Sequence, residues 1–163
     1  MEFGEYHMSS IDLKNYKNLC KDERQKIIVS RDDNEKSIGK KCEHRANNKN
    51  SSLVRQYKVD GSIFIDDSKK CDFLVLNDEK QNAYLIELKR SRILEAIEQL
   101  ESTYERIKLA LPEYQFFFRI SHAETNTHTI KNQKIIRWRE KYGQTSEGKP
   151  IADLKKTPYC EDI

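Results

Sequence analysis

Short apolar runs separated by polar turns occupy the middle of the chain and predict β-strands. Residues 71–76 and 83–89 are two such runs, and the polar residues 77–82 between them predict a hairpin. An earlier β element is predicted over 53–66, with a bend at Asp60-Gly61, because that dipeptide favours positive φ and tight turns. The pattern therefore predicts three consecutive β elements.

A helical pattern follows these runs. From residue 93 to residue 111, apolar residues recur at alternating spacings of four and three, which is the pattern of one helix face: Ile93, Ile97, Leu100, Tyr104, Ile107 and Leu111. Pro112 ends the predicted helix, and the apolar run 114–120 predicts a final buried strand. This order of elements predicts the α/β fold class.

The first part of the chain also contains apolar residues at helical spacings. They predict a helix from about Ser10 to Ile28, with Ser10 as its N-cap, and this helix would cover one face of the sheet. The Asn-rich segment 47–52 predicts a mobile loop.

Acidic and basic residues stand at matching ends of the predicted hairpin. If its strands pair, Asp72 and Glu87 lie side by side, and Lys89 shares a face with Glu87 because side chains alternate along a strand. Two carboxylates that close repel each other unless a cation lies between them, and Mg²⁺ takes one or two carboxylates together with water and phosphate oxygens. The hairpin therefore predicts a metal site suited to cleaving a phosphodiester.

Acid-x-Lys triplets are frequent in this chain, because 35% of its residues are charged. Six such triplets occur, but only Glu87-Leu88-Lys89 ends an apolar run and follows an acid that opens another, with 14 residues between Asp72 and Glu87. The alternative interpretation makes all three charged residues the solvated ends of a surface hairpin.

These residues and the order of the elements resemble the PD-(D/E)XK nuclease superfamily. The resemblance is strongest over 53–120 of a single domain, residues 1–163. It implies a restriction-endonuclease-like αβββαβ core, with a mixed central sheet flanked by helices. It also implies that Asp72, Glu87 and the Leu88 carbonyl hold Mg²⁺ or Mn²⁺, while Lys89 positions the attacking water.

The resemblance suggests two further site residues and has two departures. Gln99 lies ten residues after Lys89, as in RecB-like members, and is a catalytic candidate, although it could equally be an exposed helical glutamine. Tyr104 lies five residues after Gln99 rather than four, which favours core packing. Cys71 stands where the superfamily name has proline. The additional acid that many members take from the first helix would be Glu43, with Glu35 as the second choice.

Basic residues are concentrated toward the C-terminus. The net charge is only +3, but eight basic residues and three acids between 131 and 156 give this part a local balance of +5 within a basic extension, 121–163. Four residues are candidates for nucleic-acid contacts: Arg55, Lys58, Arg137 and Arg139. A lysine at a strand edge, such as Lys58, can instead protect the sheet against aggregation, a role that needs no ligand. Stacking of Trp138 on a base is one option; packing of a short C-terminal strand or helix through Ile135, Ile136 and Trp138 is the other.

The cysteines, histidines and apolar runs of the chain bear on its redox environment, on zinc binding and on membrane insertion. The four cysteines show no Cys-x-x-Cys spacing and predict free thiols in a reducing, cytoplasmic environment. The four histidines form no pair at helical metal spacing, so a structural zinc site is not predicted, and no apolar run has the length of a membrane span.

The sequence as a whole predicts a metal-dependent endonuclease or exonuclease, a hydrolase with DNA as the more expected substrate and RNA as the other. Defence, mobile-element and repair roles all fit, and small nucleases of this type often act as homodimers. The alternative is a catalytically inactive nuclease-fold module that binds nucleic acid or a protein partner. A purely structural charged protein, with no nucleic-acid affinity, is the third hypothesis.

Overall fold

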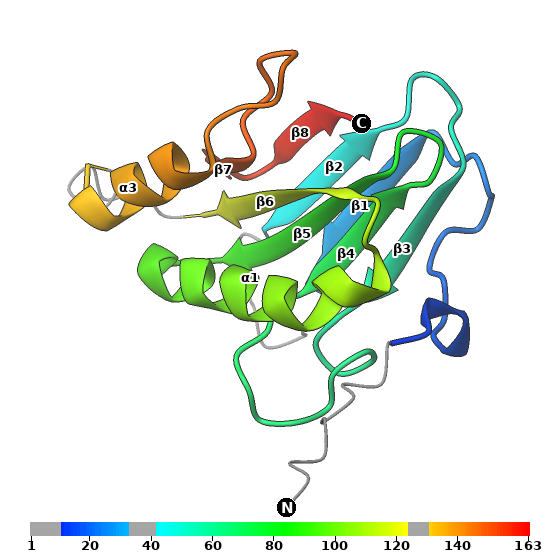
Figure 1. Ribbon diagram of the computed structural model, residues 1–163, viewed down its shortest axis with the longest axis horizontal. Coiled ribbons are helices and arrows are strands. Elements are labelled where there is room, and N and C mark those ends of the chain that lie inside the picture. The colour runs from blue at the N-terminus through cyan, green and yellow to red at the C-terminus, as the bar shows by residue number, and fades with distance from the viewer. Residues whose placement is uncertain (1–10, 33–41, 124–130) are drawn as a thin grey trace, which may run out of the picture.

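In the part of the chain that the computed structural model describes, two β-sheets pack against each other, and two α-helices cover the outer face of the larger sheet (Figure 1). The structure describes residues 11–32, 42–123 and 131–163. The expected α/β class with a mixed sheet is confirmed.

The larger sheet contains five strands in the order β3-β4-β5-β6-β7. The antiparallel part holds β3 (Val54–Lys58), β4 (Phe73–Asn77) and β5 (Asn82–Lys89), and β6 (Gln115–His122) and β7 (Ala152–Lys156) continue it in parallel. The predicted hairpin is thus β4–β5. The predicted β element over 53–66 forms a strand only over Val54–Lys58, and the bend expected at Asp60-Gly61 follows it, where Gly61 has a φ of +90°.

Helical connections link the parallel strands, as such pairings require. Helix α1 (Ile93–Ile107) and the 3₁₀ turn η2 (Lys108–Ala110) lead from β5 to β6, and α3 (Gln133–Tyr142) precedes β7. The side chain of Asn132 caps α3 by accepting the N–H of Lys134 at 2.8 Å, and α3 buries Ile135 and Trp138. Ile135 and Trp138 therefore pack on a helix, as the second of the two options predicts, whereas Ile136 is 38% exposed.

The other face of the larger sheet is covered by a smaller sheet rather than by a helix. Its strands are β1 (Ile27–Arg31), β2 (Glu43–Asn47) and β8 (Tyr159–Asp162), in the order β1-β2-β8, with β2 and β8 parallel. The expectation of a sheet flanked by helices is therefore correct for one face only.

The predicted helix over 10–28 is wrong for the residues that the structure describes, and Ser10 lies outside them. This segment forms only the short 3₁₀ turn η1 (Leu13–Asn15) before β1 begins. Ile27 is 51% exposed and Ile28 is fully buried, so the apolar pair belongs to the alternating pattern of a strand. The predicted mobile loop at 47–52 is instead held by Asn48, whose buried side chain bonds the main chain of Ser52 at 2.8 and 3.0 Å.

Alternation along the strands divides the apolar core into two layers. The layer under the helices contains residues of even number on β4 and β6 and of odd number on β5, namely Leu74, Leu76, Ala83, Leu85, Phe116, Phe118 and Ile120. The layer between the sheets contains their neighbours, with Phe73, Val75, Tyr84, Ile86 and Phe117 facing Ile28 and Ala46. Asp72, Glu87 and Lys89 continue the register of the helix-side layer.

A buried ionic cluster lies between the two sheets. Arg119 is 1% exposed and donates to Glu161 at 2.8 Å, and the ring of His44 lies 2.7 Å from the same carboxylate. Burial alone would raise the pKa of Glu161, but the hydrogen bond with His44 and the charge of Arg119 lower this pKa to about 2. The ammonium of Lys149 lies 3.5 Å from Glu161 and donates to Tyr84 Oη at 2.6 Å. These contacts tie β6 of the larger sheet to β2 and β8 of the smaller one.

Candidate functional site

Asp72 and Glu87 come together at one end of the β4–β5 hairpin. The strands pair with Phe73 opposite Ile86, and the N–H of Asp72 donates to the Ile86 carbonyl at 3.1 Å. Asp72 Oδ2 accepts the N–H of Leu88 at 2.8 Å, which fixes the carboxylate against β5. The sequence prediction that the hairpin pairs these two acids is therefore confirmed.

Both carboxyl groups are removed from solvent. Burial raises the pKa of Asp72, and burial together with the hydrogen bond that the Glu87 carboxyl donates to the Asp72 carboxylate raises the pKa of Glu87 well above its usual range. Glu87 is 2% exposed, and its Oε2 has no hydrogen-bond partner within the described residues. The pair therefore retains a proton at pH values where ordinary carboxylates are ionised, and it leaves one buried oxygen able to bind a cation.

Lys89 follows Glu87 on the same face of β5. Its Nζ lies 3.9 Å from Glu95 Oε1 in the first turn of α1, and its charge acts against the rise in the pKa of Glu87. This arrangement places a cation beside the carboxyl pair, as the Glu-x-Lys spacing predicts.

Two residues near this end of the sheet, His122 and Asp60, are not predicted as site residues from the sequence. His122 ends β6 in register with Lys89, and burial and the charge of Lys156 lower its pKa. The negative charge of Asp60 raises the pKa of both Asp72 and Glu87, and the preceding residue, Val59, donates its N–H to the Asp72 carbonyl at 2.8 Å. The sequence pattern places Asp60 only in a turn, and no local signal marks its approach to the pair.

Gln99 supports the main chain that leads into Asp72. Its Nε2 donates to the Lys70 carbonyl at 3.2 Å, and its Oε1 is buried without a partner in the described part of the chain. Thr103, one turn further along α1, accepts the Cys71 N–H at 2.8 Å. Tyr104 packs edge-on against two β6 rings, with centroids 5.1 and 5.5 Å away, which agrees with the expected core role.

Glu43 does not lie on a helix, and that expectation is wrong; the second choice, Glu35, lies outside the described residues. It begins β2 of the smaller sheet, where hydrogen bonds from Arg31 and Arg45 to its carboxylate lower its pKa. A strand forms here because His44 and Ala46 are buried while Arg45 is exposed, an alternation with a period of two. The Glu43 carboxylate already has two cationic partners.

The four residues predicted to contact nucleic acid have different surroundings. Arg55 holds Asp78 through two hydrogen bonds of 2.7 and 2.8 Å, and Arg139 donates to Asp153 at 3.1 Å. Lys58 is exposed on β3 opposite Phe73, so it lies near the end of the sheet that carries Asp72. Arg137 is exposed on α3.

Few side chains at the carboxyl pair could act as metal ligands. Among residues 11–32, 42–123 and 131–163, no group of three or more His, Cys, Asp or Glu side chains is placed to hold a metal. Two carboxylates and a main-chain carbonyl, completed by water and phosphate oxygens, nevertheless match the coordination that Mg²⁺ prefers. The unpartnered Glu87 Oε2 fits this use.

Comparisons of the chain with protein-family models, with curated proteins and with solved structures give no match. None of the described helices has both the length and the apolar character needed to cross a bilayer.

Proposed function

We propose that this protein is a metal-dependent nuclease that hydrolyses phosphodiester bonds of nucleic acid, with DNA as its substrate. The observation that carries the proposal is the buried Asp72–Glu87 pair with Lys89 beside it. Burying two acids together costs free energy, and a fold of this size does not need them for its core. A function at the pair accounts for their burial.

In this proposal, Asp72, Glu87 and the Leu88 carbonyl hold Mg²⁺ or Mn²⁺. When bound, the metal would stabilise the negative charge that develops on the phosphate. Lys89 positions the attacking water and offsets part of the same charge. Gln99 acts through the main chain before Asp72, because its side chain holds the Lys70 carbonyl.

The order β3, β4, β5, α1 and β6 supports a restriction-endonuclease-like core, since the acid precedes the second of these strands and Glu-x-Lys ends the third. Within the described residues, no α-helix precedes β3, so the proposal concerns the βββαβ part of that core. The four free cysteines fit a reducing, cytoplasmic location.

Cleavage assays with matched variants test the proposal. The parent protein, Glu87→Gln, Lys89→Ala and the control Glu140→Gln would be incubated with plasmid DNA, single-stranded DNA and RNA, each in Mg²⁺ and in Mn²⁺. Glu140 is an exposed glutamate of α3, so its variant matches the charge change of Glu87→Gln. We expect the parent and the control to cut DNA, and the two site variants to lose at least about 100-fold in rate, as for other groups that act on the reacting phosphate.

Two results would contradict the proposal. Cleavage by Glu87→Gln and Lys89→Ala at the parent rate would remove the assigned mechanism. Absence of cleavage in the parent, combined with salt-dependent binding of DNA, would favour the non-catalytic nuclease-fold module instead. Preferential cutting of RNA would correct the substrate alone.

A further inference from the structure

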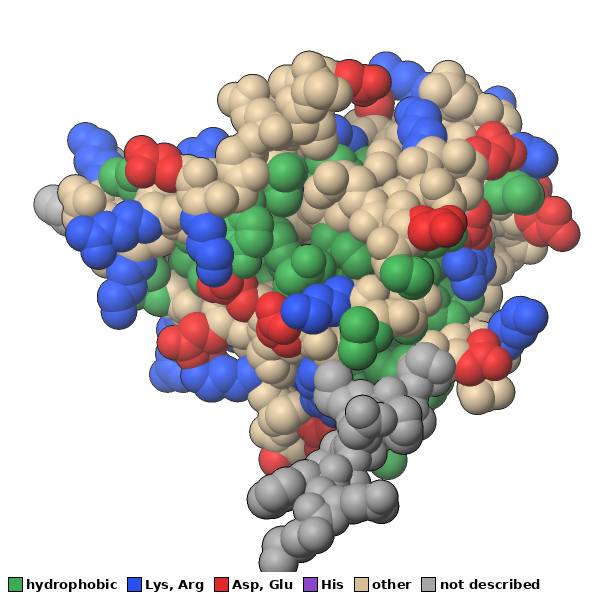
Figure 2. Space-filling view, viewed as in Figure 1, with side chains coloured by type: hydrophobic (Ala, Val, Ile, Leu, Met, Phe, Trp, Pro, Cys, Tyr) green, Lys and Arg blue, Asp and Glu red, His purple; other side chains and the backbone are tan. Residues whose placement is uncertain are grey.

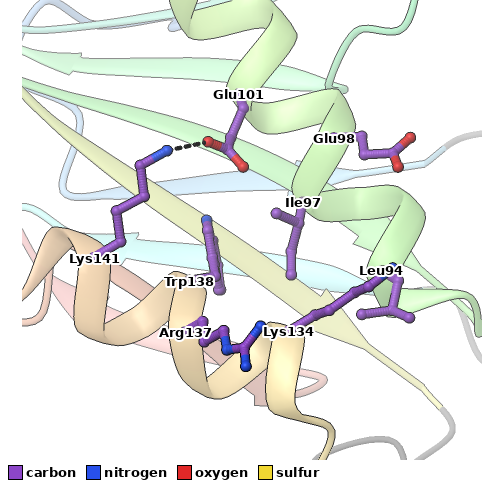
Figure 3. Close-up of a pocket in the computed structure, with 8 residues that line it drawn as sticks. All are labelled: Leu94, Ile97, Glu98, Glu101, Lys134, Arg137, Trp138 and Lys141. Carbon is purple, nitrogen blue, oxygen red and sulfur yellow. Dashed lines mark hydrogen bonds and ion pairs between the residues drawn. The ribbon is translucent and has the colours of Figure 1, made fainter.

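A groove separates α1 from α3 on the helix-covered side of the larger sheet (Figure 3). Its volume is about 290 Å³. Leu94 and Ile97 of α1 and Trp138 of α3 form its apolar floor, while charged side chains from both helices form its rim. The groove thus offers an apolar surface bordered by charge.

The acidic residues of the rim are already paired. Glu101 accepts hydrogen bonds from Lys141 at 3.0 Å and from the Tyr142 hydroxyl at 2.7 Å, and Glu98 forms an ion pair with Lys69. These pairs neutralise the α1 side of the groove.

Two basic residues on the α3 side of the groove lack such a close ion pair. Lys134 and Arg137 are exposed, and neither lies within 4.0 Å of a carboxylate in the described ranges, although the charge of Lys134 contributes to the lowered pKa of Glu98 across the groove. Figure 2 shows Lys and Arg side chains gathered over α3, at the left of the view. The groove therefore presents two cations to an anionic ligand.

The floor also contains a hydrogen-bond donor without an acceptor. Trp138 is 3% exposed, and its Nε1 finds no partner in the part of the chain that the structure describes. In Figure 3 the indole lies between the two helices, with its nitrogen directed from α3 toward α1. A ligand that brings an acceptor into the groove would satisfy this N–H, whose burial otherwise costs free energy.

The groove begins close to the proposed catalytic residues. Leu94 and Glu98 flank Glu95 on the first turns of α1, and the Glu95 carboxylate lies 3.9 Å from Lys89 Nζ. A strand whose phosphate lies at the Asp72–Glu87 pair could thus reach the groove within about one helical turn.

We propose that this groove binds one unpaired nucleotide of the nucleic-acid strand that the site cleaves, and this inference rests on the proposed nuclease function. The base lies on Leu94 and Ile97 with an acceptor on the Trp138 N–H, and the phosphates contact Lys134 and Arg137. A base inside a duplex is stacked and paired and cannot enter a groove of this size without leaving the helix. The substrate is therefore single-stranded or locally unpaired at the cleavage site.

Trp138 allows this binding to be measured directly, because it is the only tryptophan in the chain. The full-length chain with Glu87→Gln, in EDTA, would be titrated with an oligodeoxythymidylate of about eight nucleotides, a length that suits single-strand sites. We expect tryptophan fluorescence to change on binding, and a duplex of the same length to produce a much smaller change.

Variants of the two exposed cations supply the second measurement. Loss of two phosphate contacts should lower the slope of log K against log[salt] by about 1.4, and should weaken binding on the order of tenfold at about 0.1 M salt. Lys134→Gln/Arg137→Gln would be compared with Lys14→Gln/Lys17→Gln, which changes two exposed lysines in and just after η1, the dark blue turn on the opposite side of Figure 1 from α3. The control pair should leave both quantities unchanged.

An unchanged salt slope in Lys134→Gln/Arg137→Gln would overturn the groove proposal, as would an equal fluorescence response to duplex. A response to polyglutamate but not to the oligonucleotide would overturn it in favour of an acidic protein segment. These measurements use no metal and no cleavage, so they separate the groove from the nuclease proposal. Cleavage by the parent with a failed titration would remove the groove alone.

Discussion

Replacement of Glu87 by glutamine should stabilise the metal-free protein at neutral pH. The Glu87 carboxyl is 2% exposed, and its pKa is raised well above the usual range by burial and by its contact with Asp72. A carboxyl group whose folded-state pKa is raised favours folding below its unfolded pKa, about 4.3. This contribution is lost as the pH rises toward the folded-state value, because the folded protein holds a proton that the unfolded chain releases.

The size of the effect follows from the one proton involved. In that window, the free energy of unfolding of the parent falls by about 1.4 kcal/mol per pH unit relative to Glu87→Gln. The uncharged amide removes the titration and can donate to Asp72, which keeps that carboxylate hydrogen-bonded. The two proteins should therefore be similar in stability near pH 4, and the variant should be the more stable at pH 7.

Urea unfolding in EDTA, repeated at several pH values between about 4 and 8, measures this difference. Mg²⁺ provides a second reading, because a ligand at a hundred times its Kd stabilises the folded state by about 2.7 kcal/mol. We expect Mg²⁺ to stabilise the parent and to have little effect on Glu87→Gln. Glu140→Gln should follow the parent throughout. Parallel pH curves for the parent and Glu87→Gln would refute the reasoning.

Three further substitutions test the structure around the site. Glu161→Gln should lower the free energy of unfolding by about 3–5 kcal/mol, measured by urea unfolding at pH 7, because Arg119 would remain buried without a counter-charge. Since the pKa of Glu161 is lowered to about 2, the free energy of unfolding of the parent should fall as this carboxylate is protonated below about pH 4. The variant has no carboxyl here and should lack this part of the fall, so an equal fall in both proteins would contradict the prediction. Ile135→Ala should cost about 2–5 kcal/mol in thermal or urea unfolding, and a near-zero cost would show that α3 is not packed. Thr103→Val removes the acceptor of the Cys71 N–H and should lower the free energy of unfolding by about 1–3 kcal/mol. Cleavage should also decrease if Asp72 moves. Equal stability of the variant and the parent would show that this hydrogen bond does not hold the main chain before Asp72.

Local patterns in the sequence were sufficient to predict the β4–β5 hairpin. A polar turn between two apolar runs sets the register of β4 and β5, and this register alone brings Asp72 to Glu87. The spacing of four and three in α1 and the apolar run of β6 likewise lie within single segments, so their faces can be read from one periodicity.

Near the N-terminus, the sequence pattern fits both a helix and a strand, so it did not predict the secondary structure correctly. Ile27 and Ile28 fit a helical segment, and Glu43 lies in a charged stretch that gives no clear period. Ile27 and Ile28 belong to β1 and Glu43 to β2 of the smaller sheet. The parallel partner of β2 is β8, which is more than a hundred residues away in sequence. No local signal identifies such a pairing, because its stabilisation comes from burial against the larger sheet.

By itself, the sequence determined the β4–β5 hairpin, the helix that follows it and the three residues of the proposed chemistry. Only the tertiary structure decided that Glu87 is buried with an unpartnered oxygen, that Glu43 is paired with arginines and that α3 lies beside α1 to form a groove. The physical reason is that periodicity fixes which face of a segment is apolar, whereas burial, pKa and the shape of a groove depend on which distant segment covers that face.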